Sequence, residues 1–249
     1  MPHLDVVSLA EDWALASMID AHWQLLAKQL ECPASQWRDN RGDRMYAAVL
    51  WLNTHFDHAK PVMEDDRVVQ TSKITAIRKP YAISTTTYSV DGSARVHMSA
   101  LTCFVKRDHG ASNSKLSKVR DIWTFPDFNA DRVNTLLEQH HVAKGTVTHA
   151  SYGETYHVNR IQDFNNAELF YFKNYVRVAR AAEWRAFQDK PRLSALRECW
   201  FFGNVDDADV LNISVENSGS DVLSCINREN GDRLFLAKSD APYLDINGT

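Results

Sequence analysis

Between Leu15 and Leu30, apolar positions recur at spacings of three and four residues, which places them on one face of a helix. The face comprises Leu15, Met18, Ile19, His22, Trp23, Leu26 and Leu30. Ser8 and Glu11 have the spacing of a capping box, in which the two side chains satisfy backbone amides at the start of a helix. The helix is therefore predicted to begin there and to end near Pro33, because proline has no amide with which to continue it.

From Met45 onward the hydrophobic pattern becomes that of strands. Runs rich in Val, Ile, Thr and aromatic residues cover positions 45–56, 67–78, 83–90 and 95–105. Asp91 and Gly92 separate the last two runs, and this pair is a strong signal for a tight hairpin turn. The first half of the chain is therefore predicted to be a long helix followed by an antiparallel meander.

The second half of the chain repeats this order. A second apolar face, made of Leu169, Phe172, Val176, Ala179 and Phe187, predicts a long helix within residues 165–189. Strand patterns follow over 197–205, 209–217, 221–230 and 232–239, with Asn230 and Gly231 at the last turn. Residues 106–150 interrupt the rhythm and are predicted to form a crossover with a short helix from Asp131 to His140.

The repeated order indicates an internal duplication. Each half is predicted to be a two-layer α+β unit, in which an antiparallel sheet buries the apolar face of one long helix. Two such units can pair their sheets edge to edge and carry both helices on the concave face, which is the double hot dog architecture. We expect a first hot dog unit over residues 1–125, with the start of the crossover, and a second over residues 126–249.

The composition excludes some classes of partner. The chain has 249 residues, 28 Lys and Arg against 32 Asp and Glu, and a formal net charge of −4. A protein that coats nucleic acid needs concentrated positive charge, so no nucleic acid partner is expected. No apolar run is long enough to span a membrane, and acids stand where a signal peptide carries its basic region. We therefore expect a cytoplasmic protein with no membrane partner.

Neither the cysteines nor the histidines form a metal-binding pattern. The cysteines lie far apart in apolar surroundings and are expected to be reduced thiols: Cys32, Cys103, Cys199 and Cys225. His55 and His58 lie close together in the sequence, as do His140 and His141, but neither pair has a third ligand at a suitable spacing. We therefore expect no bound metal.

Three segments resemble those of a known family. They are MPHL with LAEDWALASMIDAHWQLLAKQL in the first predicted helix, Arg44-Met45-Tyr46-Ala47 at the start of a strand, and DFNNAELFYF at the second helix. In these segments the chain resembles the double hot dog family of the leinamycin-pathway bifunctional acyltransferase/decarboxylase, and the similarity spans most of the chain. Asn166 and Glu168 stand where members of that family tend to have a glycine-rich turn.

The resemblance implies an enzyme of polyketide biosynthesis that uses a coenzyme A thioester as substrate and no cofactor. Such an enzyme takes a malonyl or methylmalonyl group from coenzyme A, decarboxylates it and delivers the acyl group to an acyl carrier protein. The resemblance also implies a catalytic tyrosine on the first hot dog unit, and Tyr46 is the best match. The expected partners are an acyl-CoA and an acyl carrier protein. The chain is expected to be a monomer or a homodimer, because a double hot dog already contains the pairing that single hot dogs obtain by dimerising.

Polar residues just before the second predicted helix are further candidates. Asp163, Asn165 and Asn166 lie where a carboxylate or amide either caps the helix or faces a substrate. Free amides and the positive end of the helix dipole at such a place stabilise an oxyanion or enolate. We take Asp163 and Asn165 as catalytic candidates and Asn166 as a substrate-binding candidate, with capping as the alternative role for at least one of them.

A hydroxyl and several cations complete the substrate-binding candidates. Ser84 is retained from a hydroxyl-rich run, in which neighbouring side chains point to opposite faces of the strand. Basic residues gather in the crossover: Lys106, Arg107, Lys115, Lys118 and Arg120. Lys106, Arg107 and Lys115 either belong to a solvated loop or meet the phosphates of coenzyme A or the acidic helix of a carrier protein.

Two other classes of function stay open. One is a hot dog thioesterase or dehydratase that acts on acyl-CoA or acyl carrier protein thioesters. A dehydratase would need a His paired with an Asp or Glu, and no such pair stands at the start of either predicted helix, so hydrolysis ranks above dehydration. The other class is a non-catalytic module that binds a carrier protein.

Overall fold

The computed structural model describes residues 3–5, 7–107, 112–113, 115–119, 126–187 and 194–240. The chain divides into two compact units. Unit 1 comprises residues 1–111 and 115–140, and unit 2 comprises residues 112–114 and 141–249. The division therefore falls within a helix near residue 140, whereas the sequence placed it at residue 125.

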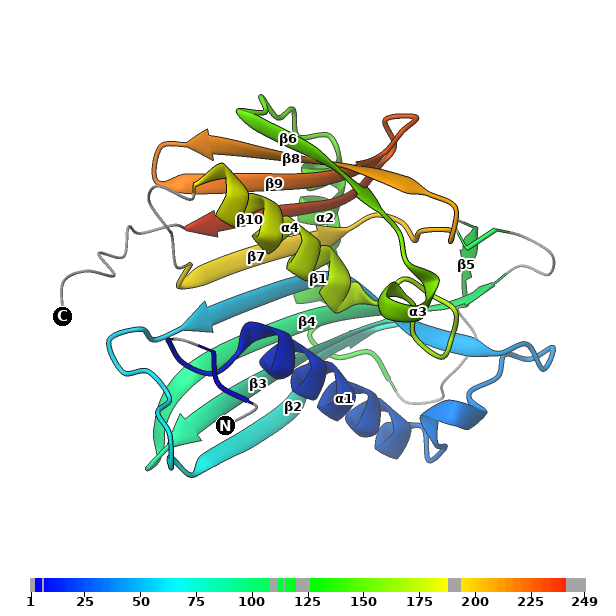
Figure 1. Cartoon of the computed structure of the whole chain (residues 1–249). Coiled ribbons are helices and arrows are strands. Elements are labelled where there is room, and N and C mark those ends of the chain that lie inside the picture. Colours follow the sequence, from blue (N-terminus) through cyan, green and yellow to red (C-terminus); the bar gives the residue numbers. More distant parts are fainter. Residues whose placement is uncertain are drawn as a thin grey trace. The chain divides into compact units, whose positions relative to one another are not determined.

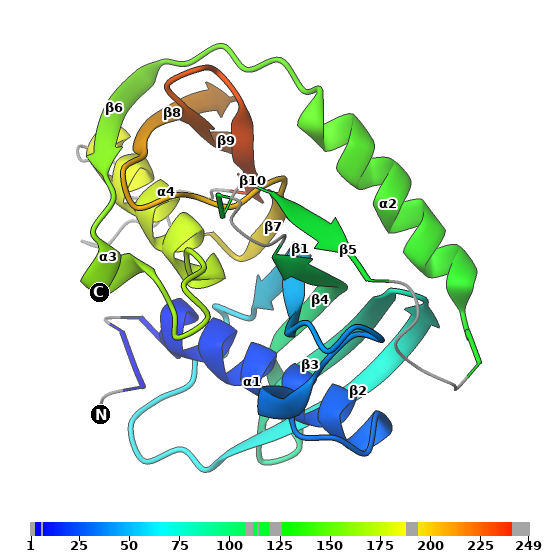
Figure 2. The same ribbon diagram turned by 90° about the vertical axis from the view of Figure 1, so that its right-hand side faces the viewer.

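Unit 1 is a helix packed on an antiparallel sheet. Its elements are α1 (Glu11–Gln29), the 3-10 helix η1 (Ala34–Gln36), β1 (Met45–Phe56), β2 (Val68–Arg78), β3 (Tyr81–Val90), β4 (Ser93–Arg107) and β5 (Leu116–Lys118). The strand order is β2–β3–β4–β1, and β5 pairs with β4. Figure 1 shows α1 lying across this sheet, and the turned view in Figure 2 also places α1 against β2 and β3.

The apolar face of α1 is buried as its periodicity predicts, but the helix begins later than expected. Leu15, Met18, Ile19 and Leu26 are almost completely buried. The predicted capping box is wrong: α1 begins at Glu11 without a side-chain cap. The Ser8 hydroxyl instead accepts a hydrogen bond from the Val62 amide at 2.9 Å, so it joins two distant segments rather than capping the helix.

Unit 2 has the same two-layer construction. The long helix α2 (Ala130–Lys144) leads into it, followed by β6 (Tyr152–His157), α3 (Arg160–Asp163), α4 (Phe172–Ala186), β7 (Leu196–Phe201), β8 (Val210–Ser218), β9 (Asp221–Arg228) and β10 (Arg233–Asp240). The strand order is β7–β10–β9–β8–β6, and α4 packs on β8, β9 and β10 (Figure 1). The edge strand β6 was not predicted; it lies between the predicted crossover and the second predicted helix.

The two turn signals give different turns. Asp91 and Gly92 have φ values of 50° and 75°, as a two-residue hairpin turn with positive φ at both positions requires. The hairpin between β9 and β10 does not turn on Asn230 and Gly231 alone. The Arg228 amide bonds to Asp232 O, and Gly231 adopts a φ of 88°. This hairpin therefore has the longer loop 229–231, with glycine at its left-handed position.

In each unit, a titratable side chain of the long helix bonds to polar side chains of the sheet. His22 and Glu183 are each the twelfth residue of their helices, α1 and α4. His22 Nδ1 lies 2.8 Å from Ser84 Oγ, and its Nε2 lies 2.8 Å from Thr102 Oγ1. Burial lowers the pKa of His22 to about 4, so its ring is neutral at neutral pH.

Glu183 is paired instead with an arginine. Its carboxylate accepts two hydrogen bonds from Arg197, at 2.9 and 3.0 Å, and one from Ser224 Oγ at 2.6 Å. Burial raises the pKa of Glu183, but the charge and hydrogen bonds of Arg197 outweigh that effect and leave the pKa below its ordinary value. Equivalent helix positions thus carry a neutral cluster in unit 1 and an ion pair in unit 2.

No helix among the described residues has the length and hydrophobicity needed to cross a membrane. Within the same ranges, no group of three or more His, Cys, Asp or Glu side chains is placed to hold a metal ion. Cys103, Cys199 and Cys225 are buried thiols, and Cys32 is a partly exposed one.

Candidate functional site

The segment that leads into α4 is built around one buried carboxylate. Asp163 ends α3 and has no exposed surface. Its oxygens accept hydrogen bonds from Tyr156 Oη at 2.8 and 3.0 Å, from the Asn159 amide at 2.8 Å and from Arg177 Nη2 at 2.9 Å. The Arg177 side chain is 41% exposed, so the network runs from the interior of unit 2 to its surface.

Tyr156 is held inside this network. Burial raises the pKa of Tyr156, and the hydrogen bond to Asp163 adds to the rise, while Arg177 opposes it. The Arg177 guanidinium also lies 5.8 Å from the centre of the Tyr156 ring. Tyr156 is therefore a protonated donor to the Asp163 carboxylate at neutral pH.

The α3–α4 loop, residues 164–171, is folded by Asn165. The Asn165 side-chain oxygen accepts from the amides of Ala167 at 2.9 Å and Leu169 at 3.2 Å, and the Asn165 amide bonds to Leu169 O at 2.9 Å. These contacts close a tight turn in which Glu168 has a φ of 56°. Asn166 lies exposed on the same turn.

Asp163 and Asn165 thus hold the α3–α4 loop in shape, while Asn166 faces solvent. The sequence predicted that these residues lie directly before the second long helix, but α4 begins only at Phe172: Asp163 ends α3, and Asn165 and Asn166 lie in the α3–α4 loop. Their predicted catalytic and substrate-binding roles stay predictions. The partners Tyr156 and Arg177 were not foreseen. The alternation of Tyr152, Glu154 and Tyr156 was the one available signal for the strand that carries Tyr156.

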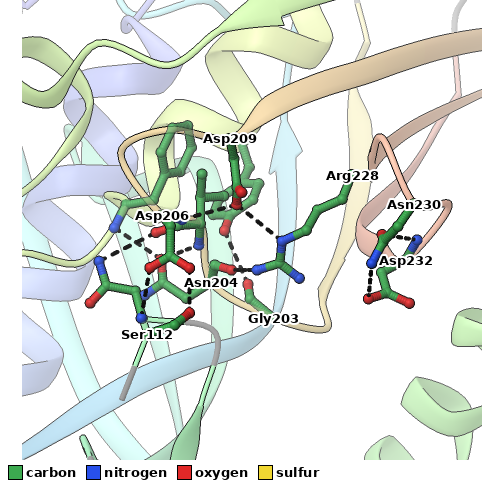
Figure 3. Close-up of polar contacts among 12 residues, drawn as sticks. Ser112, Gly203, Asn204, Asp206, Asp209, Arg228, Asn230 and Asp232 are labelled. Atoms are coloured by element: carbon green, nitrogen blue, oxygen red, sulfur yellow. Dashed lines mark hydrogen bonds and ion pairs between the residues drawn. The ribbon is translucent and has the colours of Figure 1, made fainter. Parts of the chain in front are cut away.

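The loop 202–209, whose polar contacts are drawn in Figure 3, is hydrogen-bonded to the α3–α4 loop and to α4. Asn204 Oδ1 accepts from the Phe170 amide at 3.0 Å, and Tyr175 Oη donates to Gly203 O at 3.0 Å. Arg228 donates to Asn204 O and, at 3.0 Å, to Asp209 Oδ2. Figure 3 shows Arg228 reaching this loop from β9.

A piece of the crossover is fastened to the same loop. Asp206 accepts hydrogen bonds from the Ser112 hydroxyl and, at 2.8 Å, from the Asn113 amide (Figure 3). The Asn113 side chain also donates to Glu168 O at 2.7 Å. The α3–α4 loop is therefore held on two sides by polar contacts within unit 2.

The first turns of α1 and α4 differ in charge. Neither helix has a side-chain cap among the described residues, so each leaves backbone amides at its first turn. Glu11 and Asp12 occupy the first turn of α1, and their charges offset its positive end. The first turn of α4 contains no acid and includes Lys173. The start of α4 is therefore the better place to stabilise an oxyanion.

Tyr46 lies in unit 1, on the side of the sheet that faces away from α1. Its neighbours Met45 and Ala47 are buried with Leu26 beneath α1, so alternation turns Tyr46 to the opposite face. Tyr46 is partly exposed, and the Arg44 guanidinium lies 5.3 Å from the centre of its ring. Its neighbouring polar group is thus an arginine.

The substrate-binding candidates Ser84, Arg107 and Lys115 also lie in unit 1. Ser84 has no exposed surface and bonds to His22. Arg107 is partly buried at the end of β4, opposite Leu116 of β5, and Lys115 is exposed. Lys118 donates to Tyr81 Oη at 2.8 Å, and Arg120 lies outside the described residues.

Lys106 is bound by two carboxylates. Its Nζ donates to Asp39 Oδ2 at 2.6 Å and to Asp43 Oδ2 at 2.7 Å. The hydrogen bond from Lys106 lowers the pKa of Asp39 to about 2, and the Asp39 and Asp43 hydrogen bonds raise the pKa of Lys106. The Lys106 ammonium therefore binds two carboxylates of the protein, and substrate phosphates would have to compete with them for it.

Replacing Lys106 by methionine is expected to destabilise the protein at neutral pH, because Asp39 and Asp43 then repel each other without a cation between them. Since the folded-state pKa of Asp39 is lowered from 3.8 to about 2, the pairing contributes fully above the first value and is lost as pH falls toward the second. Urea midpoints of wild type and Lys106→Met should therefore differ at neutral pH and converge near the lower value. Lys118→Met is the control, and an equal loss there would contradict this role.

Comparisons with known proteins identify the architecture. No protein-family model and no curated protein sequence matches the chain. Among solved structures, the chain is similar to the 12:0-ACP thioesterase from Umbellularia californica, with a TM-score of 0.70 and 12% identity, over 98% of this chain and 94% of that one. It is also similar to an acyl-ACP thioesterase from Bacteroides thetaiotaomicron, with a TM-score of 0.66 and 10% identity, over 96% and 93% of the two chains.

A more distant likeness links the chain to a MaoC-like dehydratase from Phytophthora capsici, with a TM-score of 0.52 and 7% identity, over 80% and 72% of the two chains. At such low identities the likeness establishes the fold alone. That fold agrees with the duplicated order of helix, meander and hairpin in the sequence. The protein has an α+β double hot dog fold, with two tandem units that each pack an antiparallel sheet against a long helix.

Proposed function

We propose that the protein is an enzyme that hydrolyses acyl thioesters carried by an acyl carrier protein or by coenzyme A. The observation that carries this proposal is the match, over nearly the full length of both chains, to structures of acyl-ACP thioesterases. The proposed reacting centre is the start of α4 with the α3–α4 loop. Acyl transfer and dehydration are the competing reactions on this fold.

The chemistry proposed for this site needs few groups. The amides of the first turn of α4 would accept the negative charge that develops on the thioester oxygen when water attacks. Lys173 would add positive charge at the same end of the helix. Asp163, Tyr156 and Arg177 would fix the loop geometry through their shared hydrogen bonds, and Asn166 would contact the substrate from the exposed side of the loop.

Product masses provide the direct test. The protein is incubated with a series of acyl-CoA and acyl-carrier thioesters of different chain lengths, and with malonyl- and methylmalonyl-CoA plus carrier protein. Hydrolysis yields the free acid and a free thiol, whereas transfer yields an acyl carrier of increased mass. Loss of carbon dioxide without hydrolysis would identify decarboxylation. Unchanged thioesters in every incubation would overturn the proposal in favour of a carrier-binding module.

Acyltransfer with decarboxylation is the second candidate, and the Tyr46–Arg44 contact favours it. A guanidinium next to a partly exposed phenol provides a cation for the carboxylate of a malonyl group and a hydroxyl for its thioester carbonyl. Tyr46→Phe separates the two candidates. Loss of carrier acylation in this variant would support transfer at Tyr46, while unchanged hydrolysis would support the start of α4.

Two neighbouring asparagines are expected to affect different kinetic constants. Asn165→Ala removes two hydrogen bonds that shape the α3–α4 loop, so kcat should fall by about tenfold. Asn166→Ala removes only an exposed side chain, so KM should rise by roughly three- to tenfold while kcat and Tm stay unchanged. Steady-state hydrolysis of one acyl-carrier substrate measures both. Identical effects of the two changes would contradict this division of roles.

A further inference from the structure

A short hairpin between η1 and β1 separates its acidic and basic side chains. Residues 38–44, here called the arginine hairpin, have the sequence Arg-Asp-Asn-Arg-Gly-Asp-Arg, and Arg38 pairs with Arg44 in an isolated antiparallel bridge. Gly42 adopts a φ of 84° at the turn. In the sequence, the charges of the three arginines and two aspartates nearly cancel, but in the structure the acids and the arginines differ in how far they are exposed to solvent.

The two acids of the arginine hairpin point inward. Asp39 and Asp43 share the Lys106 ammonium, and their side chains are only 8% and 21% exposed. Asp39 Oδ1 also accepts from the amides of Arg41 and Asp43, each at 2.9 Å. The acids therefore anchor the hairpin on β4 and fix the conformation of its tip.

The three arginines point to solvent. Arg38, Arg41 and Arg44 are all exposed, and among the described residues none of them has a carboxylate partner. Arg38 donates to the carbonyls of Ser35 and Trp37, which leaves its charge uncompensated, and Arg44 lies over Tyr46. A positively charged surface thus stands on a chain whose formal net charge is −4.

We propose that the arginine hairpin docks the acidic protein that carries the acyl thioester. This inference rests on the proposed function, since it names the partner that delivers the substrate. Guanidinium groups suit this role because they form forked hydrogen bonds with carboxylates and are weakly hydrated. The contacts of Arg38 with Ser35 and Trp37, and of Arg44 with Tyr46, hold two of the three side chains in place and so reduce the conformational entropy lost when the partner binds. The docking surface lies in the hairpin rather than in the crossover, where Lys106 is already occupied.

Charge reversal at Arg41 tests the proposal, because no other described side chain depends on it. Arg41→Glu should raise KM for an acyl-carrier substrate by about fivefold at low ionic strength, and Arg38→Glu/Arg41→Glu by more than about tenfold. The effects should shrink at high salt. Arg41→Lys, which keeps the positive charge, should leave KM for the acyl-carrier substrate close to that of wild type. The control is Lys60→Glu, which reverses another exposed cation of unit 1 and should leave KM unchanged.

Two further measurements separate docking from catalysis. Binding of apo carrier protein, measured by fluorescence anisotropy, should weaken in parallel with the rise in KM, even if no thioester is hydrolysed. Binding of free coenzyme A should not change. Equal losses in Lys60→Glu, unchanged carrier binding in the double variant, or a loss of coenzyme A binding instead would each overturn the proposal. Absence of hydrolysis with hairpin-dependent carrier binding would reject the proposed function but support the docking surface.

Discussion

Replacing Glu183 by alanine is expected to lower the free energy of unfolding by about 3–5 kcal/mol, because it removes one half of a buried ion pair. The Arg197 side chain is only 5% exposed, and both of its terminal nitrogens bond to Glu183. Ser224 also loses its acceptor. Urea-induced unfolding, followed by tryptophan fluorescence, measures the change.

Two comparisons show whether the cost comes from breaking a buried ion pair. Glu183→Leu combined with Arg197→Met removes both charges, and it should recover most of the lost stability, since well-packed apolar residues can replace a buried ion pair. Glu154→Ala breaks another ion pair of α4, with the half-exposed Arg185, and should cost less than about 1 kcal/mol. A loss in Glu183→Ala no larger than that in Glu154→Ala would contradict the argument.

The fold was predictable because its signals are local. The three-and-four spacing from Leu15 to Leu26 and the Asp91–Gly92 pair depend only on neighbouring positions in the sequence, and both give the predicted elements. The start of α1 was predicted wrongly, because Ser8 has two possible partners. A local amide competes for its hydroxyl with that of Val62, and only the folded chain brings the second one close.

The site was predictable only in part, because its contacts join distant segments. The sequence placed Asp163 and Asn165 before the second long helix, but it placed the start of that helix too early, because the residues up to Tyr171 form the α3–α4 loop. The donors to Asp163 come from β6 and α4, and no sequence pattern links Tyr156 with Arg177. Which cations are available to a ligand also depends on the fold. The sequence presents Lys106 as one of a group of basic residues, whereas in the structure it bonds to Asp39, which lies far earlier in the chain.

The buried cluster around His22 in unit 1 predicts that the protein loses stability as pH falls below neutral. His22 is fully buried with a pKa lowered from 6.5 to about 4, so the unfolded chain binds a proton on this side chain more readily than the folded one. Stability from this group is therefore complete above the ordinary pKa and is lost as pH falls toward the lowered value. The shift corresponds to roughly 3 kcal/mol between those limits.

His22→Gln isolates this contribution, because glutamine keeps hydrogen-bonding capacity toward Ser84 and Thr102 but does not titrate. The stability difference between wild type and His22→Gln should narrow by about 3 kcal/mol as pH falls from neutral to about 4. His97→Gln changes an exposed histidine of β4 and should leave the pH dependence of wild type intact. A stability difference between wild type and His22→Gln that stays constant with pH would mean that the folded chain binds a proton on His22 as readily as the unfolded chain does, and that burial does not lower its pKa. In the protonated form, the hydroxyls of Ser84 and Thr102 would then have to accept from both of its ring nitrogens.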